Sequence, residues 1–258
     1  MKKSLGQHFL KDDTVCRRII GELKKHPFPS LLEIGPGAGA LTKYLLELKE
    51  VDLKVVEIDH EKATFLKSSY PSLSAGIIEA DFLKMDIPFA GSFTVIGNFP
   101  YNISTQILFR ILDWRAQVER VIGMFQKEVA QRVAAGPGSK TYGVISVLIQ
   151  AYYKVEYLFE VSESAFNPPP KVKSAVIRLE PLTDPVIVKS EKLFFILVKT
   201  AFNQRRKMLR NALRGLFSEE ALREELFMKR AEQLSVADFA ALTFRMNEPG
   251  NAARREDN

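Results

Sequence analysis

Residues 30–42 read Ser-Leu-Leu-Glu-Ile-Gly-Pro-Gly-Ala-Gly-Ala-Leu-Thr, and this stretch decides the fold. The apolar start predicts a short buried strand, which leads into a glycine turn at Gly35, Gly37 and Gly39 and then into a helix. Glycines in such a turn let the main chain approach a ligand closely. The G-x-G-x-G spacing differs from the G-x-G-x-x-G of dinucleotide-binding folds, which argues against a pyrophosphate held on the helix terminus.

Acidic residues follow the next two apolar strands. Glu57 ends one of them and Asp81 ends the other. In an open parallel sheet ligands bind outside the carboxyl ends of the strands, so we expect Glu57 to hold ribose hydroxyls and Asp81 to hold an adenine amino group. Acids at such positions are often helix caps, which is the interpretation that we favour for Asp59 and Glu79.

A fourth apolar strand runs directly into the sequence Asn98-Phe-Pro-Tyr101. The Asn98 amide oxygen and a main-chain carbonyl near Pro100 can accept both N–H bonds of an exocyclic amino group, and Tyr101 offers a ring on which a base can stack. Such a site suits N-methylation of adenine. The alternative is an ordinary strand-to-helix turn, because Asn and Pro are common turn residues.

The periodicity of apolar residues gives the organisation of the chain. Strands are expected at about 30–35, 53–58, 76–80, 93–98, 119–126, 153–161 and 174–180. Helices are expected at about 13–25, 40–49, 60–68, 104–114, 127–135 and 142–151. This alternation predicts an α/β domain with a mostly parallel, doubly wound sheet over residues 1–182. The pattern after Pro181 predicts a small all-α domain over residues 183–258.

Composition restricts the class of protein. Cys16 is the only cysteine and the three histidines are scattered, so the sequence predicts neither a disulfide framework nor a zinc site. The start of the chain lacks the apolar core of a signal peptide, and the longest apolar run, residues 193–198, is too short to span a bilayer. We therefore expect a soluble cytoplasmic protein with no membrane partner.

Positive charge gathers in one stretch. The formal net charge is +6, and residues 193–218 contain no acid. The six basic residues of this stretch are Lys199, Arg205, Arg206, Lys207, Arg210 and Arg214. Arg206, Arg210 and Arg214 recur every fourth residue, which on a helix would form one stripe suited to a phosphate backbone. A solvated helix face is the alternative, but the absence of acids together with an adenine-type site favours RNA.

Several of these motifs, in this order, resemble the ribosomal RNA adenine N6,N6-dimethyltransferases, and the resemblance extends over nearly the whole chain. The motifs are Gly6-Gln-His-Phe-Leu10, the glycine turn, Glu57, Asp81, Asn98-Phe-Pro-Tyr-Asn-Ile-Ser-Thr105 and Phe166-Asn-Pro-Pro-Pro-Lys-Val-Lys-Ser174. The family has a small-subunit branch and a large-subunit branch that confers macrolide resistance. Residues 140–147 and 200–211 resemble the small-subunit branch.

The resemblance implies a Rossmann-like methyltransferase domain that uses S-adenosylmethionine and no metal, with residues 1–12 as a lid over the cofactor. The residues implied to contact the cofactor are His8, Leu10, Gly35, Gly37, Gly39, Glu57, Ile58, Asp81, Phe82 and Asn98. Many relatives carry Asn where His8 stands, so a main-chain contact is the more plausible one there. Phe166 is either a second ring that faces the base opposite Tyr101 or a core aromatic beside a rigid proline turn.

The implied activity is dimethylation of N6 on two adjacent adenosines in the 3′-terminal hairpin loop of 16S rRNA, within the assembling small ribosomal subunit. We expect the enzyme to be a monomer whose helical domain binds RNA through Arg206, Arg210 and Arg214. The alternatives are a large-subunit rRNA adenine N6-methyltransferase of the macrolide-resistance type and a non-catalytic small-subunit assembly factor. The intact glycine turn, Glu57, Asp81 and Asn98 favour catalysis over the latter.

Overall fold

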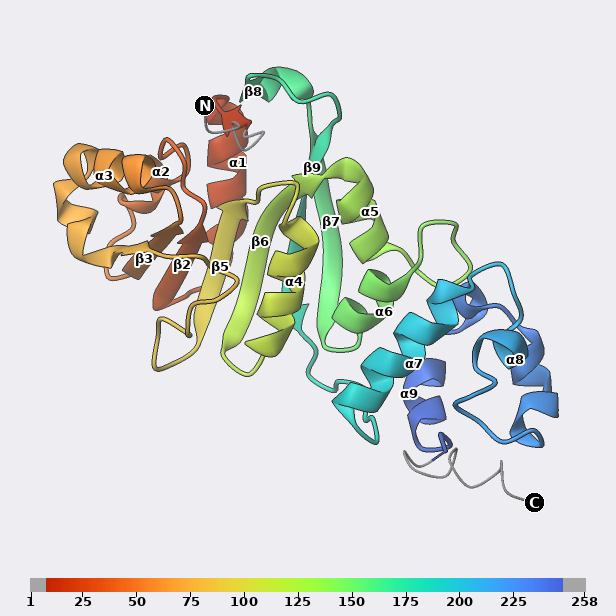
Figure 1. The fold of residues 1–258 in the computed structure, drawn as a ribbon. Coiled ribbons are helices and arrows are strands. Elements are labelled where there is room, and N and C mark those ends of the chain that lie inside the picture. The colour runs from red at the N-terminus through yellow and green to blue at the C-terminus, as the bar shows by residue number, and fades with distance from the viewer. Residues whose placement is uncertain (1–7, 248–258) are drawn as a thin grey trace. The chain divides into compact units, whose positions relative to one another are not determined.

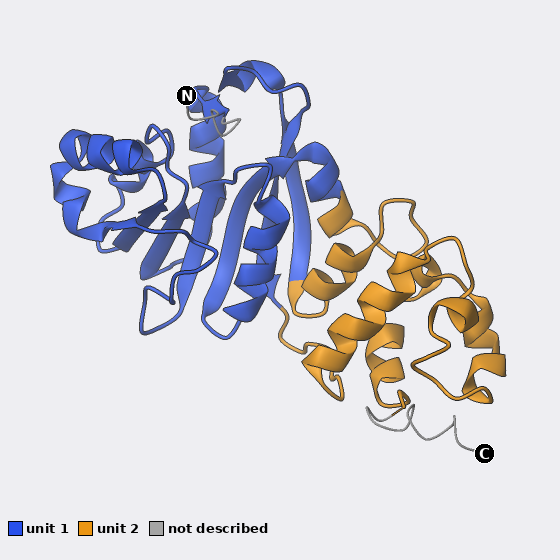
Figure 2. Ribbon diagram, viewed as in Figure 1, with its two compact units in different colours: residues 1–131, 154–181 blue, residues 132–153, 182–258 orange. Residues whose placement is uncertain are grey.

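The structure is a computed structural model that describes residues 8–247. It divides into two compact units (Figure 2). Residues up to 131 and residues 154–181 form the first, and residues 132–153 and those from 182 onward form the second. The sequence predicts a single boundary after residue 182, whereas in the structure the segment 132–153 also belongs to the helical unit. Its helix α6 (Val144–Gln150) is apolar and packs against α7 (Glu191–Asn203), a partner that periodicity alone does not reveal.

The first unit is built on one seven-stranded sheet in the order β4-β3-β2-β5-β6-β9-β7. Its strands are β2 (Ser30–Ile34), β3 (Asp52–Glu57), β4 (Ile77–Glu79), β5 (Phe93–Asn98), β6 (Val118–Gln126), β7 (Tyr153–Val161) and β9 (Ser174–Pro181). The five strands from β4 to β6 are parallel, and β9 pairs antiparallel with β6. The mostly parallel, doubly wound sheet expected from the sequence is confirmed. All the expected strands are present.

Helices cover both faces of this sheet, with α4 in front of it and α1 behind in Figure 1. The helices of this unit are α1 (Asp13–Leu23), α2 (Thr42–Leu45), α3 (His60–Ser69), α4 (Ser104–Asp113) and the larger part of α5 (Lys127–Ala134), whose last three residues belong to the second unit. The Asp59 carboxylate accepts the main-chain N–H groups of Glu61 and Lys62, so its expected role as a helix cap is confirmed. Helix α2 is shorter than the sequence predicts because turns occupy residues 37–41 before it and residues 46–47 after it.

The core of the first unit forms where α1 packs on the sheet. The apolar side of α1, which includes Cys16, Ile19 and Leu23, is almost completely buried. It belongs to one cluster with Ile96 of β5 and Ile122 of β6. Burial of an apolar helix face of this size is the main source of stability for such an element, since an isolated helix of this length is marginal in water.

A second, two-stranded sheet ties the N-terminal segment to a distant part of the chain. Strand β1 (Phe9–Leu10) pairs antiparallel with β8 (Phe166–Asn167), with Phe9 opposite Asn167 and Leu10 opposite Phe166. Residues 1–7 of the expected lid lie outside the described residues. The described end of that segment is therefore held by main-chain pairing.

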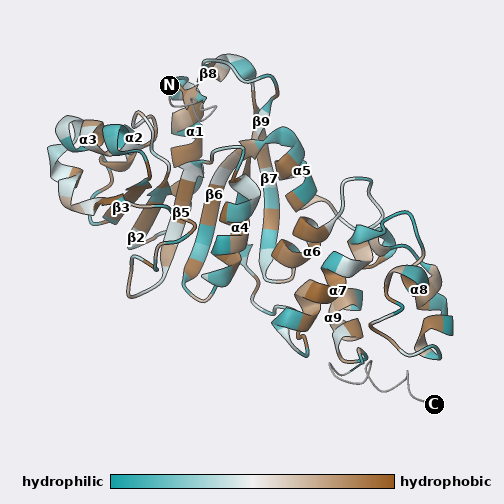
Figure 3. Ribbon diagram, in the orientation of Figure 1, coloured by the Kyte–Doolittle hydropathy of each residue, from teal (hydrophilic) through white to brown (hydrophobic). Residues whose placement is uncertain are grey.

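The second unit is helical. Besides α6 and α7 it contains α8 (Leu209–Ala212), α9 (Val236–Thr243) and short 3-10 turns at Ala221–Arg223, Glu225–Met228 and Ala231–Gln233. Helices α6 and α7 are strongly apolar along much of their length (Figure 3). No helix in residues 8–247 is long and apolar enough to cross a membrane.

The prediction that Arg206, Arg210 and Arg214 form a stripe on one helix is wrong. Helix α7 ends at Asn203 and α8 spans only four residues, so Arg206, Arg210 and Arg214 do not lie on one continuous helix. The physical reason is a competing partner for the main chain: Leu209 donates its N–H to the carbonyl of Lys229 instead of to a preceding helical turn. All three arginine side chains are nevertheless exposed.

Candidate active site

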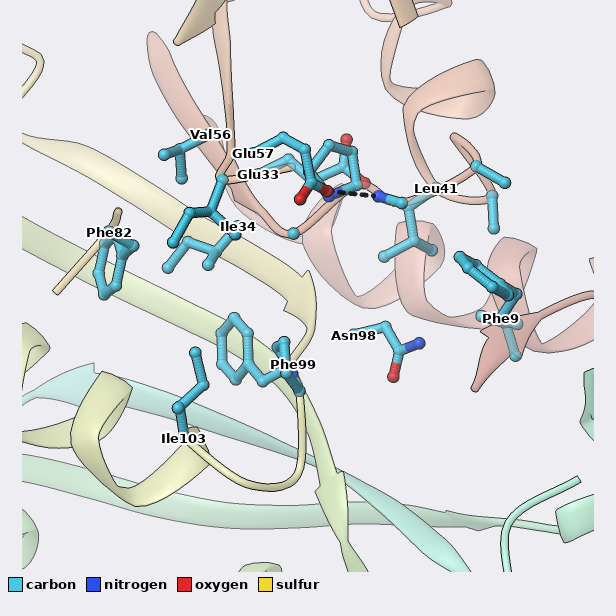
Figure 4. Close-up of a pocket in the computed structure, with 18 of the residues that line it drawn as sticks. Phe9, Glu33, Ile34, Leu41, Val56, Glu57, Phe82, Asn98, Phe99 and Ile103 are labelled. Atoms are coloured by element: carbon cyan, nitrogen blue, oxygen red, sulfur yellow. Dashed lines mark hydrogen bonds between the residues drawn. The ribbon is translucent and has the colours of Figure 1, made fainter. Parts of the chain in front are cut away.

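One cavity opens at the carboxyl ends of β2, β3 and β5, where the sequence predicts ligand binding (Figure 4). It is lined by the glycine turn, the ends of the strands, the N-terminal segment and the Asn98–Tyr101 tetrapeptide. The predicted site residues that line it are His8, Leu10, Gly35, Gly37, Glu57, Ile58, Asp81, Phe82, Asn98, Pro100 and Tyr101. Gly39 and Phe166 are not among its lining residues.

The glycine turn has a conformation that other residues rarely adopt. Gly35, Gly37 and Gly39 have φ values of 66°, 58° and 81°. A Cβ atom on Gly37 would lie 3.2 Å from the Phe9 ring, and one on Gly39 would lie 2.8 Å from the Tyr70 ring. Gly35 and Gly37 therefore shape the cavity wall, while Gly39 is needed for the turn and its packing.

Glu57 is buried, with 4% of its surface exposed, and its carboxylate organises the adjacent loops. Its Oε2 accepts the N–H of Gly37 at 3.3 Å, and its Oε1 accepts the N–H of Asp59 at 3.0 Å. A carboxylate oxygen has more than one acceptor position, so both oxygens can also accept from ligand hydroxyls.

Asp81 lies at the opening of the turn that follows β4. Its Oδ1 accepts the N–H of Leu83 at 3.0 Å, and its Oδ2 is 3.7 Å from the exposed Lys84 ammonium. One oxygen is thus used as a cap, and the other remains a candidate acceptor for a ligand amino group. The neighbouring Phe82 ring is buried and packs edge-on against Trp114, with the ring centroids 5.0 Å apart.

Glu33 is a cavity residue that the sequence argument missed. It is 2% exposed, and burial raises its pKa to about 7. The Thr42 hydroxyl donates to the Glu33 Oε2 at 2.7 Å, and this hydrogen bond lowers the pKa of Glu33. The negative charge of Glu57 raises it further. Figure 4 shows the two glutamates together on one side of the cavity. The available signal was an acid inside the apolar strand Leu31–Ile34.

Asn98 projects from the end of β5 with its amide orientation defined. The amide Nδ2 donates to the main-chain carbonyl of His8 at 3.2 Å. A carbonyl is only an acceptor, so this bond fixes which end of the amide is nitrogen and leaves Oδ1 as the acceptor. The orientation is the one that binding an amino group requires.

Pro100 and Tyr101 continue this wall. The Pro100 carbonyl accepts the Ile103 N–H at 3.2 Å and keeps a second lone pair. Tyr101 is half-buried, and its hydroxyl lies 2.5 Å from the Ser174 Oγ. Burial raises the pKa of Tyr101, the bond to Ser174 lowers it, and the Glu163 charge raises it, so the net shift is upward and the side chain stays a neutral phenol near neutral pH.

The main-chain carbonyl of His8 accepts from Asn98, and its side chain contacts Pro168 and Tyr101. Its Nδ1 donates to the Pro168 carbonyl at 2.8 Å, and its ring centroid lies 5.6 Å from that of Tyr101. Leu10 is buried and contributes to the same wall. The described part of the N-terminal segment, residues 8–10, therefore lines the cavity.

Phe166 occupies the core instead of the cavity. It is 1% exposed and belongs to the cluster around α1 that includes Leu10 and Ile19. Pairing of β8 with β1 turns its ring inward, so no ring face is open to a base in this structure. Of the two interpretations of Phe166, its position supports the packed aromatic.

The exposed arginines belong to the second unit and are not part of the cavity. Arg205, by contrast, forms a salt bridge with Glu232, with 2.9 Å between its Nε and the Glu232 Oε2.

Within residues 8–247 no group of three or more His, Cys, Asp or Glu side chains is arranged to hold a metal ion.

The mostly parallel sheet, with a glycine turn after β2, Glu57 at the end of β3 and Asp81 after β4, has the architecture of a Rossmann-like methyltransferase. The family model for ribosomal RNA adenine dimethylase matches residues 1–247. The chain belongs to this family.

Two relatives and two solved structures illustrate the match. The chain is 52% identical to "Ribosomal RNA small subunit methyltransferase A" of Flavobacterium johnsoniae, over 96% of this chain and 97% of that protein. It is 51% identical to the protein of the same name from Bacteroides thetaiotaomicron, over 100% and 98% of the two chains. A dimethyladenosine transferase from Plasmodium falciparum superposes with a TM-score of 0.74 at 25% identity, over 90% and 94%. The 23S rRNA methyltransferase ErmE gives 0.67 at 24% identity, over 92% and 100%, which shows the shared fold.

Proposed function

We propose that this protein transfers methyl groups from S-adenosylmethionine to N6 of two adjacent adenosines in the 3′-terminal hairpin loop of 16S rRNA. The observation that carries the proposal is the orientation of the Asn98 amide. Its nitrogen donates to the His8 main-chain carbonyl, which directs its oxygen to serve as the acceptor for an N–H of the base. The names of the relatives support the small subunit as the source of the substrate. We further propose that the enzyme acts as a monomer on the assembling subunit.

The residues present fit the cofactor. A Cβ on Gly37 would lie only 3.2 Å from the Phe9 ring, and without a side chain the main chain at Gly37 can approach a ligand closely. Glu57 supplies acceptors for ribose hydroxyls, Asp81 supplies one for the adenine amino group, and the buried Phe82 offers an apolar surface to the ring. When bound, S-adenosylmethionine supplies an electrophilic methyl group on a sulfonium.

The tetrapeptide activates the target nitrogen without a base. Adenine N6 is a weak nucleophile because its lone pair is delocalised into the ring. Accepting its two N–H bonds at Asn98 Oδ1 and the Pro100 carbonyl favours a pyramidal nitrogen whose lone pair faces the methyl group. The same carbonyl dipoles and the Tyr101 ring face stabilise the positive charge that develops on N6, and the proton then leaves to water.

We propose that the second unit binds the RNA. Arg206, Arg210 and Arg214 are each exposed in this unit, and contact with phosphates does not require them to share one continuous helix. We propose that these side chains contact rRNA phosphates, which supplies affinity without base specificity.

Two other functions are less well supported. A large-subunit enzyme would share the cavity, but the relatives that match at 51–52% identity over nearly the full chain are named for the small subunit. A non-catalytic assembly factor has no need for a buried Glu57 beside a glycine turn or for an oriented Asn98 amide.

The test is tritium transfer from labelled S-adenosylmethionine into small subunits and into free large-subunit rRNA, with mapping of the labelled base. We expect label on adjacent adenosines of 16S rRNA. Asn98→Ala should lower transfer by about 10²-fold or more, as loss of one preorganised polar contact does. Its cofactor affinity, measured by calorimetry, should stay near wild type. Label in large-subunit rRNA alone would refute the proposed substrate, and near-normal turnover of Asn98→Ala would refute the proposed mechanism.

A further inference from the structure

Ser174 is a buried polar residue whose hydroxyl is directed at the proposed catalytic tetrapeptide. It is 0% exposed, and its Oγ lies 2.5 Å from the Tyr101 hydroxyl. Tyr101 lines the cavity and Ser174 does not. The Ser174 hydroxyl is therefore connected to the cavity through its hydrogen bond to Tyr101.

The two partners differ in how firmly the main chain holds them. Tyr101 lies in the turn between β5 and α4, where Ser104 Oγ donates to its carbonyl at 3.1 Å. Its ring can rotate about two side-chain bonds. Ser174 is the first residue of β9 and pairs with Gln126 in the antiparallel ladder with β6. The ladder thus offers a fixed support for the far end of a rotatable ring.

We propose that Ser174 is a positioning residue for methyl transfer, whose hydroxyl holds the Tyr101 ring in the orientation that stacks on the target base. This inference rests on the proposed function. Asn98 is oriented in a comparable way by the His8 carbonyl, so both side chains that act on the base are held by segments distant in sequence. Ring orientation matters because stacking and the attraction of a cation to an aromatic face both depend on geometry.

Removing the Ser174 hydroxyl should slow methyl transfer without weakening the binding of the cofactor. Ser174→Ala loses one hydrogen bond, which corresponds to a decrease in kcat of about 3- to 10-fold. The affinity for S-adenosylmethionine should not change, because Ser174 is not part of the cavity wall.

A double-mutant cycle on kcat tests the mechanism. Tyr101→Phe keeps the ring and removes the other partner of the same bond. If Ser174 acts through Tyr101, Ser174→Ala should have no further effect in the Tyr101→Phe background. Effects that multiply in the double variant would overturn the proposal.

Ser146→Ala is the matched control. Ser146 is also 0% exposed, and its Oγ donates to the Arg132 carbonyl at 2.5 Å. Its replacement should lower the melting temperature and leave kcat unchanged. A Ser174→Ala variant that behaves in this way, with a lower melting temperature and a wild-type kcat, would show a structural role only and would refute the proposal.

A second readout needs no substrate. In protein labelled at the tyrosine ¹³Cζ, the Tyr101 resonance is identified by its loss in Tyr101→Phe, and it should shift in Ser174→Ala. An unshifted resonance would refute the hydrogen bond itself. A wild-type chain that transfers no methyl group would refute the proposed function, whereas an active wild type with an unaffected Ser174→Ala variant would refute the role of Ser174 alone.

Discussion

Replacing Glu33 with glutamine should stabilise the protein at pH 8 and have little effect at pH 4.5. Burial raises the pKa of Glu33 from 4.5 to about 7 in the folded protein. Below pH 4.5 the carboxyl is protonated in both the folded and the unfolded chain. As pH rises from 4.5 to 7 the unfolded chain releases this proton first, so the free energy of unfolding falls, and above pH 7 the loss is constant.

The size of the effect follows from the two pKa values. The gap between about 7 and 4.5 corresponds to about 3 kcal/mol, at 1.36 kcal/mol for each pKa unit. Glutamine carries no charge at any pH, and its amide oxygen can still accept from the Thr42 hydroxyl. The free energy of unfolding of Glu33→Gln should therefore lack the decrease that the wild type shows between pH 4.5 and pH 7.

Urea unfolding of the cofactor-free protein at both pH values measures this difference. The free energy of unfolding of Glu33→Gln minus that of the wild type should increase by about 3 kcal/mol between pH 4.5 and pH 8. Glu47→Gln, which removes an exposed carboxylate, controls for the change in net charge. A Glu33→Gln difference that is the same at both pH values would refute the assignment of a raised pKa to Glu33.

Three further predictions concern the cofactor, the RNA and the tetrapeptide. Glu57→Ala and Asp81→Ala should each weaken S-adenosylmethionine binding by about 1–3 kcal/mol in calorimetry, and unchanged affinity in both would mean that the cavity holds another ligand. Replacing Arg206, Arg210 and Arg214 with Gln should flatten the salt dependence of small-subunit binding by about 0.7–0.9 log units per lost contact and leave cofactor binding intact; an unchanged slope would make them a solvated surface. Gly123→Ala should destabilise the fold by about 1–3 kcal/mol, because its Cβ would meet the rings of both Phe99 and Phe125, and Phe99→Leu, which removes one of the two contacts, should recover part of this loss. The Cβ of Gly97→Ala would lie 2.6 Å from both the Phe99 ring and the Ile34 carbonyl oxygen, so the same Leu should rescue it less, because the main-chain contact remains; equal rescue of both variants in thermal unfolding would contradict the packing argument.

The sequence was sufficient for features that depend on local chemistry. Alternating strands and helices predicted the doubly wound sheet, and the turn at Gly35 and Gly37 could be located because few residues other than glycine adopt positive φ. Glu57 and Asp81 could be placed at one edge because the carboxyl ends of parallel strands meet there.

Other features required the partner segment to be known. Phe166 turns into the core because β8 pairs with β1, and the arginine stripe is interrupted because Leu209 donates to Lys229 instead of extending a helix. Neither partner can be read from the periodicity of the segment itself, since periodicity reports which residues are buried and not what buries them.

What the sequence by itself determined is therefore the fold class, the position of the cavity and the amino-acid types that line it. The tertiary structure alone decided how those side chains are oriented and charged. The Asn98 amide is oriented by His8, 90 residues away, the Tyr101 ring is held by Ser174, 73 residues away, and Glu33 has a raised pKa because the surrounding fold excludes water. Hydrogen-bond geometry and desolvation depend on distances between segments, which exist only once the chain has folded.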